Sequence, residues 1–195
     1  MRPLCRKLLL CTALLLCSTM VWAQKNMSEI FSAMPDSIIP YLTKNNRLDC
    51  IDFKANNMKA VVENAFSSKS ELKTLTDDFL MMQLNETTSL QLKLLPTQSD
   101  TLLCMVMTYA LPEPDSHLSI YHTDWREIGN KNILPASLNG YSGCQQYLFS
   151  KDDCTLTVSL KPFFSTEKPN DHNQQATNNQ QPTTLIYHWN GTTME

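Results

Sequence analysis

The side chains that could act in acid–base or metal chemistry are few and widely separated. Two of the four histidines, His117 and His122, fall on one expected strand. Their odd spacing puts them on opposite faces, so they cannot bind one metal ion together. The sequence has no Cys-x-x-Cys pair, no Gly-x-Ser-x-Gly turn, no phosphate-binding glycine loop and no His-Glu-x-x-His motif. The sequence therefore contains no recognisable reaction centre.

Two pairs of adjacent carboxylates, Asp77-Asp78 and Asp152-Asp153, are the other candidates for chemistry. Neighbouring residues on a strand point apart, so neither pair makes a facing acid and base. Asp152-Asp153 is typical of a turn. We therefore expect that the protein is not an enzyme and that it has no catalytic residues, cofactor or metal site.

Polar side chains on two expected strands could instead form a flat recognition surface. One strip is Ser89, Gln91 and Lys93, and the other is Thr155, Thr157, Ser159 and Lys161. A solvated sheet face is the simpler interpretation of both strips. Trp125 follows another expected strand, where a tryptophan is most often a core anchor and less often a binding residue. The candidate interaction surface consists of Trp125, Tyr121, Thr155, Thr157 and Lys161.

The elements that would position these residues are mostly strands. Between residues 88 and 160 apolar and polar side chains alternate with a period of two, which predicts antiparallel strands joined by short turns. The first of them, from residue 88, is apolar on one face only, and the second, near 102–107, is apolar on both. The expected strands are 88–94, 102–107, 117–122, 147–149, 154–161 and 185–189, and we expect the C-terminal tail to return to the sheet.

The chain before residue 66 has the spacing of helices. Short helices are expected between residues 27 and 55, followed by an amphipathic helix at 58–66. The β-branched pair Val61-Val62 leaves a strand possible there. Residues 68–84 fit a helix or a strand equally well. The sequence therefore predicts an α+β fold, with N-terminal helices packed on an antiparallel sheet of about six strands.

One tract does not fit this order. Residues 165–184 contain eight Asn or Gln residues and a single clearly apolar residue, Ala176. Such a composition cannot bury enough surface to offset the entropy of ordering it. We expect a flexible loop within a single domain that covers residues 24–195.

The first 23 residues have the pattern of a secretory signal peptide. A basic start is followed by the apolar run 8–20 and by a small residue, Ala23, at the cleavage position. Leucine precedes both Cys11 and Cys17, which argues against lipidation. Cleavage between Ala23 and Gln24 would leave 172 residues (195 minus 23) with a charge of about -6 (13 minus 19). We expect a soluble periplasmic or secreted protein that has no membrane span and does not bind nucleic acid.

Four cysteines follow the signal: Cys50, Cys104, Cys144 and Cys154. In an oxidising compartment they can pair in three ways or remain free thiols. If residues 150–153 form a tight turn, Phe149 faces Cys154 and Cys144 lies near Ser159. Cys144 and Cys154 would then be too far apart to bond.

Two long strings resemble a known family. They are AMPDSIIPYLTKNNRLDCIDF (33–53) and ELKTLTDDFLMMQLNETTSLQLKLLP (71–96). With the hairpin that follows and the pair Asp124-Trp125, they resemble an uncharacterised family of exported proteins from Bacteroidales, known only as a domain of unknown function. The resemblance implies a location in the Gram-negative envelope or outside the cell. It supplies no catalytic residues, and the Asn/Gln-rich tract looks like an insertion.

These observations lead to two functional hypotheses. The first is an exported, non-enzymatic module of the bacterial envelope that binds a protein or a glycan through a sheet face or edge. The alternative is a periplasmic carrier of a small apolar ligand, with a pocket between helices and sheet. That pocket would be lined by Met81, Met82, Met105 and Met107.

Overall fold

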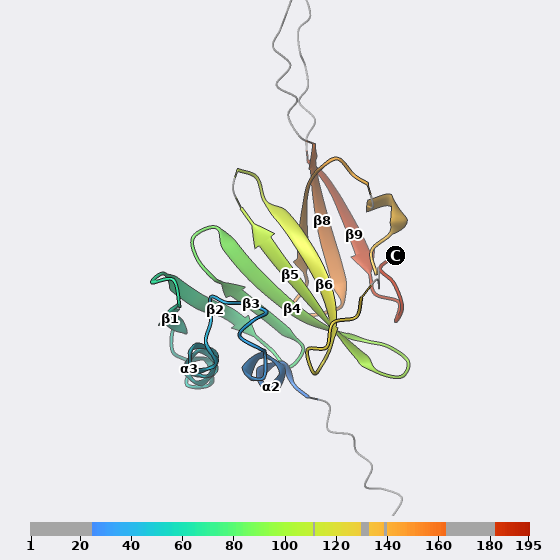
Figure 1. Cartoon of the computed structure of the whole chain (residues 1–195). Helices are drawn as coiled ribbons and strands as arrows, with labels where there is room; N and C mark the ends of the chain where they lie inside the picture. Colours follow the sequence, from blue (N-terminus) through green and yellow to red (C-terminus); the bar gives the residue numbers. More distant parts are fainter. Residues whose placement is uncertain (1–24, 111, 130–132, 139, 163–181) are drawn as a thin grey trace, which may run out of the picture.

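The computed structural model describes residues 25–110, 112–129, 133–138, 140–162 and 182–195. The expected signal peptide and nearly all of the expected loop at 165–184 lie outside these residues. The described chain forms two antiparallel sheets and two short helices (Figure 1).

The larger sheet is a meander in which each strand pairs with its neighbours in sequence. Its strands are β1 (Val61–Glu63), β2 (Lys69–Leu75), β3 (Phe79–Gln83), β4 (Thr88–Pro96), β5 (Thr101–Tyr109) and β6 (Asp115–His122). Of the two possibilities at 58–66, the structure has the strand and not the amphipathic helix, because the β-branched pair Val61-Val62 pairs with β2. Residues 68–84, which the sequence leaves open, form the hairpin of β2 and β3.

The smaller sheet contains β7 (Gly143–Phe149), β8 (Thr155–Pro162) and β9 (Thr183–His188), in that order. The turn between β7 and β8 is longer than expected, so Phe149 pairs with Leu156 and Cys144 pairs with Lys161. Strand β9 begins at Thr183, two residues inside the expected loop. The C-terminal tail returns to the sheet, as predicted, through a bridge between Trp189 and Met194.

Both helices are capped by side chains that precede them. Helix α2 (Met27–Ser32) begins after Asn26, whose side chain accepts a hydrogen bond from the Glu29 N–H. Helix α3 (Lys44–Ala55) begins after Thr43, which forms a reciprocal capping box with Asn46. A short 3-10 turn (Ala136–Leu138) precedes β7. Because the helices are short and the sheets dominate, the α+β prediction is confirmed only in part.

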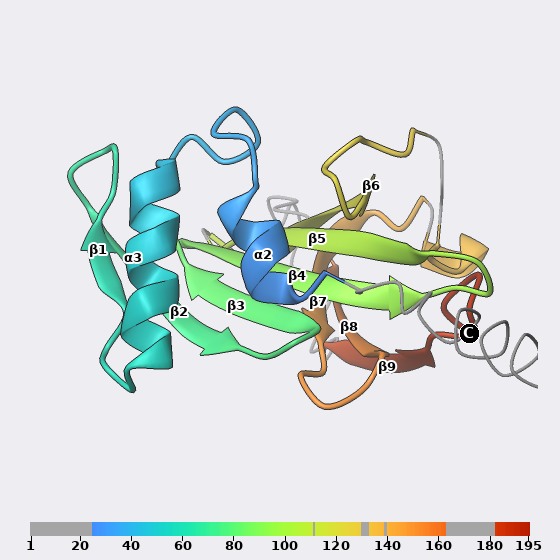
Figure 2. The same cartoon turned by 90° about the horizontal axis from the view of Figure 1, so that it is seen from below.

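The structure has three layers: the helices, the larger sheet and the smaller sheet (Figure 2). One apolar cluster lies between the helices and the larger sheet, where Leu90, Leu92 and Leu94 meet Ile30 and Phe31. A second cluster lies between the two sheets and includes Cys104, Val106, Leu156 and Val158 among its members. Strands β4 and β5 are therefore covered on both faces.

The polar side of β4 was expected to face solvent, and that expectation is wrong. Gln91 is 3% exposed and Lys93 is 0% exposed, because the smaller sheet packs over them. The covering strands follow β4 by about fifty residues in the chain, so the alternation within β4 identifies a strand without showing what covers it.

All four cysteines after the expected signal are free thiols in the structure. Cys50 and Cys104 are buried, and Cys144 and Cys154 are partly buried. Neither α2 nor α3 has the length and apolar character that would let it cross a membrane.

Candidate functional site

The smaller sheet has one face against the larger sheet and one face directed away from it. Leu156 and Val158 of β8 point into the core, so the alternating residues Thr155, Thr157 and Ser159 point outward. The strand register extends this surface onto β7 and β9. We call this surface the outer face; it consists of Cys144, Gln146, Leu148, Thr155, Thr157, Ser159, Lys161, Thr184, Ile186 and His188.

The centre of the outer face is an apolar row. Thr157 of β8 pairs with Leu148 on one side and with Ile186 on the other. Leu148 is 46% exposed and Ile186 is 62% exposed. Neighbouring strands lie about 4.8 Å apart, so the two aliphatic side chains flank Thr157 closely. The neighbouring rows, Gln146–Ser159–Thr184 and Thr155–His188, are polar, so this surface has an apolar centre with a polar rim, as in many protein interfaces.

Lys161 provides a charge near one end of the outer face. Its Nζ donates to Glu113 at 2.6 Å, and both side chains are partly exposed. The pair is at the surface and contributes little to stability. Because Glu113 precedes β6, the contact ties the larger sheet to the rim of the outer face.

Thr155 and His188 form a hydroxyl–imidazole pair at the opposite end, with Thr155 Oγ1 and His188 Nδ1 3.1 Å apart. A hydrolytic triad needs a carboxylate that orients the imidazole. Here Asp153 accepts from the Thr155 N–H instead. Hydrogen bonds from the side chains of Thr155 and Ser150 lower the pKa of Asp153. The carboxylate therefore orders the turn, and in the described part of the chain no hydrogen bond joins it to the imidazole.

Trp125 and Tyr121 do not share a surface with Thr155, Thr157 and Lys161. Trp125 is 6% exposed, and its Nε1 donates to the Ile30 carbonyl oxygen of α2 at 2.8 Å. Its ring centroid is 5.5 Å from that of Tyr121, which is partly buried. Both residues belong to the helix-side core. The structure therefore places Trp125 in the core, in agreement with the core-anchor interpretation, and does not bring Trp125 and Tyr121 onto one surface with Thr155, Thr157 and Lys161.

The structure adds two residues that the sequence interpretation missed, Leu148 and Ile186. Each lies between two apolar neighbours that point into the core: Tyr147 and Phe149 in β7, and Leu185 and Tyr187 in β9. An apolar residue at a position that points outward breaks the alternation of apolar and polar residues expected when one face of a strand is solvated. That break is the signal that could have identified Leu148 and Ile186.

The inner edge of the smaller sheet is closed by side chains of the larger sheet. Gln91 accepts from the Phe149 N–H and donates to the Tyr147 carbonyl oxygen. Ser116 accepts from the Tyr147 N–H at 3.0 Å, and Asp115 accepts from the Gln145 N–H at 2.9 Å. These contacts satisfy the backbone of β7 much as another strand would. They also fix the orientation of the outer face.

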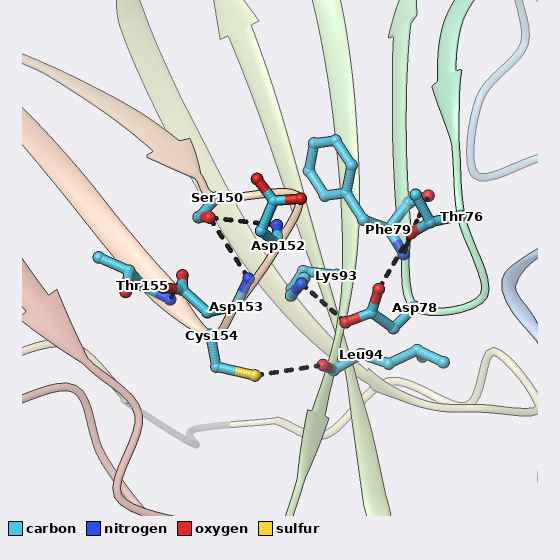
Figure 3. Close-up of polar contacts among 10 residues, drawn as sticks. All are labelled: Thr76, Asp78, Phe79, Lys93, Leu94, Ser150, Asp152, Asp153, Cys154 and Thr155. Carbon is cyan, nitrogen blue, oxygen red and sulfur yellow. Dashed lines mark hydrogen bonds and ion pairs between the residues drawn. The ribbon is translucent and has the colours of Figure 1, made fainter.

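A cavity of about 540 Å³ lies where the end of β4 approaches the start of β8. It is lined by Lys25, Asn26, Asp77, Asp78, Leu94, Pro96, Thr101 and Cys154. Beside it, the buried Lys93 Nζ donates to Asp78 at 2.8 Å and lies 5.7 Å from the centroid of the Phe79 ring (Figure 3). The second oxygen of Asp78 accepts from Thr76.

The reactive groups around this cavity are already engaged in interactions with other protein groups. Asp78 neutralises Lys93, and burial raises the pKa of the Cys154 thiol, which is 4.0 Å from the Leu94 carbonyl oxygen. A protonated thiol and a paired ammonium are poor nucleophiles. Among the described residues, at this cavity or outside it, no group of three or more His, Cys, Asp and Glu side chains is placed to hold a metal ion.

The four methionines of the carrier hypothesis do not line one pocket. Met82, Met105 and Met107 pack in the helix-side cluster, whereas Met81 packs against the cluster between the sheets. The larger sheet separates the two sides. The structure therefore does not bring these four side chains together.

Comparison with known proteins gives a fold and a family. The structure resembles "Structure of a domain of an uncharacterized protein from Porphyromonas gingivalis W83", with a TM-score of 0.63 and 19% sequence identity. The match covers 87% of this chain and 96% of that one. No curated protein matches the sequence significantly. Residues 19–158 match the family described as "Protein of unknown function (DUF3256)". This match spans more than half of the chain and agrees with the resemblance found in the sequence, so the chain belongs to the DUF3256 family.

Proposed function

We propose that this protein is an exported, non-enzymatic interaction module of the bacterial envelope that binds a protein partner through the outer face. The observation that carries the proposal is the row Leu148–Thr157–Ile186, in which two exposed aliphatic side chains flank the centre of a flat sheet. Burying exposed apolar surface at the centre of a contact is the main source of affinity in protein association.

The chemistry of the outer face favours a protein over a glycan. Glycans bind best to aromatic rings, on which sugar C–H groups stack. In the described part of the smaller sheet, the aromatic residues Tyr147, Phe149 and Tyr187 pack toward the core. Apart from Cys144 and His188, the outward side chains are aliphatic, hydroxyl or amide groups with one lysine, which suits a protein surface with a few apolar residues.

The proposed location rests on the N-terminal sequence. The basic start, the apolar run 8–20 and Ala23 form an export signal, and cleavage after Ala23 would release the folded domain beyond the cytoplasm. The porphyromonad origin of the similar structure is consistent with a Gram-negative envelope.

A pull-down from envelope extract tests the proposal, with full-length chains expressed in their host and captured through a C-terminal tag. We expect the wild type to retain a stoichiometric protein and Leu148→Asp to lose it. Met58→Asp is the matched control, because Met58 is exposed to a similar extent on the loop before β1. Equal recovery with L148D and M58D would contradict the proposal. Capture of glycan in place of protein would also contradict it.

A further inference from the structure

Strand β9 forms the outer edge of the smaller sheet. His188 N–H donates to the Glu195 carbonyl oxygen, and Glu195 N–H donates back to His188. The next residue, Trp189, donates instead to Cys154 at the end of the turn before β8. In an antiparallel strand, the N–H and C=O groups of consecutive residues point to opposite sides, so residues two apart point to the same side. Thr184 and Ile186 therefore point the same way as His188, away from β8.

The C-terminal tail covers this edge only at its end. The tail pairs with His188 and forms the bridge between Trp189 and Met194. Met194 is buried in the cluster between the sheets and donates to the Ile133 carbonyl oxygen. This anchoring fixes the tail. In the described residues, the edge beside Thr184 and Ile186 borders no further strand.

The composition of β9 lacks the usual protection of an edge strand. Natural edges carry charged residues, proline or bulges that prevent pairing with another chain. The strand reads Thr-Thr-Leu-Ile-Tyr-His, with no Lys, Arg, Asp, Glu or Pro. The inward side chains Leu185 and Tyr187 are only partly buried, because they lie at the border of the core. An added strand would cover both.

The other sheet edges are less suited to pairing. Gln91, Asp115 and Ser116 already close β7. Asp115 and Ser116 belong to β6, so these contacts also occupy the edge of β6, which in addition bridges Glu127 at Tyr121. Strand β1 is three residues long and contains Glu63, which would repel a like charge in an antiparallel self-pairing. An uncharged strand paired with its own copy meets no such repulsion.

We infer that a second copy of this chain pairs with β9, antiparallel and about a two-fold axis, so that the two smaller sheets become one continuous sheet. The inference goes beyond the proposed function and does not depend on it. Thr184 of each copy exchanges backbone hydrogen bonds with Ile186 of the other, and the two Leu185 residues face each other on the axis. Such an edge contact is isologous and closes as a dimer.

The C-terminal tail sets this register. If Ile186 faced Ile186 of the second copy, Thr184 of that copy would lie opposite His188. The backbone groups of His188 are taken by Glu195, so that arrangement is blocked. Placing Leu185 on the axis pairs Thr184 with Ile186, whose edge-side backbone groups have no partner among the described residues, and leaves only Pro182, which precedes β9, opposite His188. The outer faces of the two copies then join side by side.

Sedimentation velocity over a wide concentration range tests the inference, with protein purified from cells that express the full-length chain. We expect a species of about twice the monomer mass that dissociates on dilution. Ile186→Lys should give a monomer, because it places two lysines beside the joined edges. Leu148→Lys is the matched control: it changes the same row of the outer face but lies on the far strand, and it should remain a dimer.

Covalent trapping tests the register. The two Leu185 residues would form a non-hydrogen-bonded pair with Cα atoms about 4.5 Å apart, within the reach of a disulfide at about 4.4–6.8 Å. Under mild oxidation Leu185→Cys should give a covalent dimer that neither the wild type nor Leu148→Cys gives. A monomeric wild type at every concentration would overturn the inference. Loss of the dimer in L148K but not in I186K would also overturn it, because the contact would then be face to face.

The two proposals fail separately. If the wild type is a monomer and L148D loses the protein partner, the dimer is contradicted and the proposed function is supported. If the wild type is a dimer and L148D retains the protein partner, the proposed function is contradicted and the dimer is supported.

Discussion

The Gln91 side chain takes the place of a neighbouring strand for Phe149: its Oε1 accepts from the Phe149 N–H at 2.9 Å. The same amide donates to the Tyr147 carbonyl oxygen at 3.3 Å. One buried residue of β4 thus satisfies two backbone groups of β7 and joins the two sheets. The outer face has a fixed orientation because of this junction.

Replacing Gln91 with leucine should destabilise the fold by about 1–3 kcal/mol, because it leaves a buried N–H and a buried carbonyl without partners. Urea unfolding followed by far-UV circular dichroism measures the change. Gln146→Leu, on the outer face of the same smaller sheet, should have little effect. Equal stability of Q91L and the wild type would show that water replaces the amide.

The ion pair between Lys93 and Asp78 should respond asymmetrically to mutation. Lys93 is fully buried, whereas Asp78 is 46% exposed. Asp78→Ala leaves a buried ammonium without its counter-charge and should cost about 3 kcal/mol, whereas Lys93→Met leaves a carboxylate that water can solvate and should be nearly neutral. Denaturant unfolding of both variants and of the double variant D78A/K93M separates these effects. A larger loss of unfolding free energy in K93M than in D78A would contradict the expectation that the unpaired buried ammonium is the costlier of the two charges.

Trp125→Phe should loosen α2. The substitution keeps an aromatic ring in the core but removes the donor to the Ile30 carbonyl oxygen, at an expected cost of about 1–2 kcal/mol. Amide hydrogen exchange should increase in residues 27–32 before it increases in β4 and β5. Tyr109→Phe, at an exposed aromatic residue, is the control. Unchanged exchange in α2 would mean that the indole bond does not anchor this helix.

The buried thiols should make stability fall at alkaline pH. Burial, with a smaller contribution from the nearby Asp49 carboxylate, raises the pKa of Cys50 from 9.0 to about 11, so the folded state holds this proton more tightly than the unfolded chain. The stabilisation is fully present below pH 9 and is lost as pH rises toward 11.

Unfolding free energies measured across this pH window should fall less steeply in Cys50→Ala than in the wild type. Burial raises the pKa of Cys104 in the same direction, so some slope should persist in that variant. Identical slopes would rule out Cys50 as a source of the effect.

The sequence predicts the strands of this protein better than it predicts what covers them. Alternation identified the strands around Leu92 and Val158, since it reflects the local geometry of an extended chain. It could not show that Lys93 is buried, because the covering strands β7 and β8 lie far along the chain. For the same reason the polar strip of β4 was assigned to solvent.

The candidate site was also predicted in part. Thr155, Thr157 and Lys161 share the outer face, as their spacing of two requires. The sequence could not show that Trp125 lies apart from them, because its partner, the Ile30 carbonyl oxygen, lies 95 residues earlier in the chain. Leu148 and Ile186 were missed because each lies in an apolar run that reads as core, and only the register of β7, β8 and β9 shows that both point outward.

The central claim is that a protein partner docks on the outer face, and site-specific photo-crosslinking in living cells tests it most directly. A photo-reactive amino acid replaces Thr157, at the centre of the apolar row, or Lys69, exposed on β2 of the larger sheet. We expect a discrete covalent adduct with a different protein at position 157 and none at position 69. An adduct at position 69 alone, or none at either position, would contradict the account.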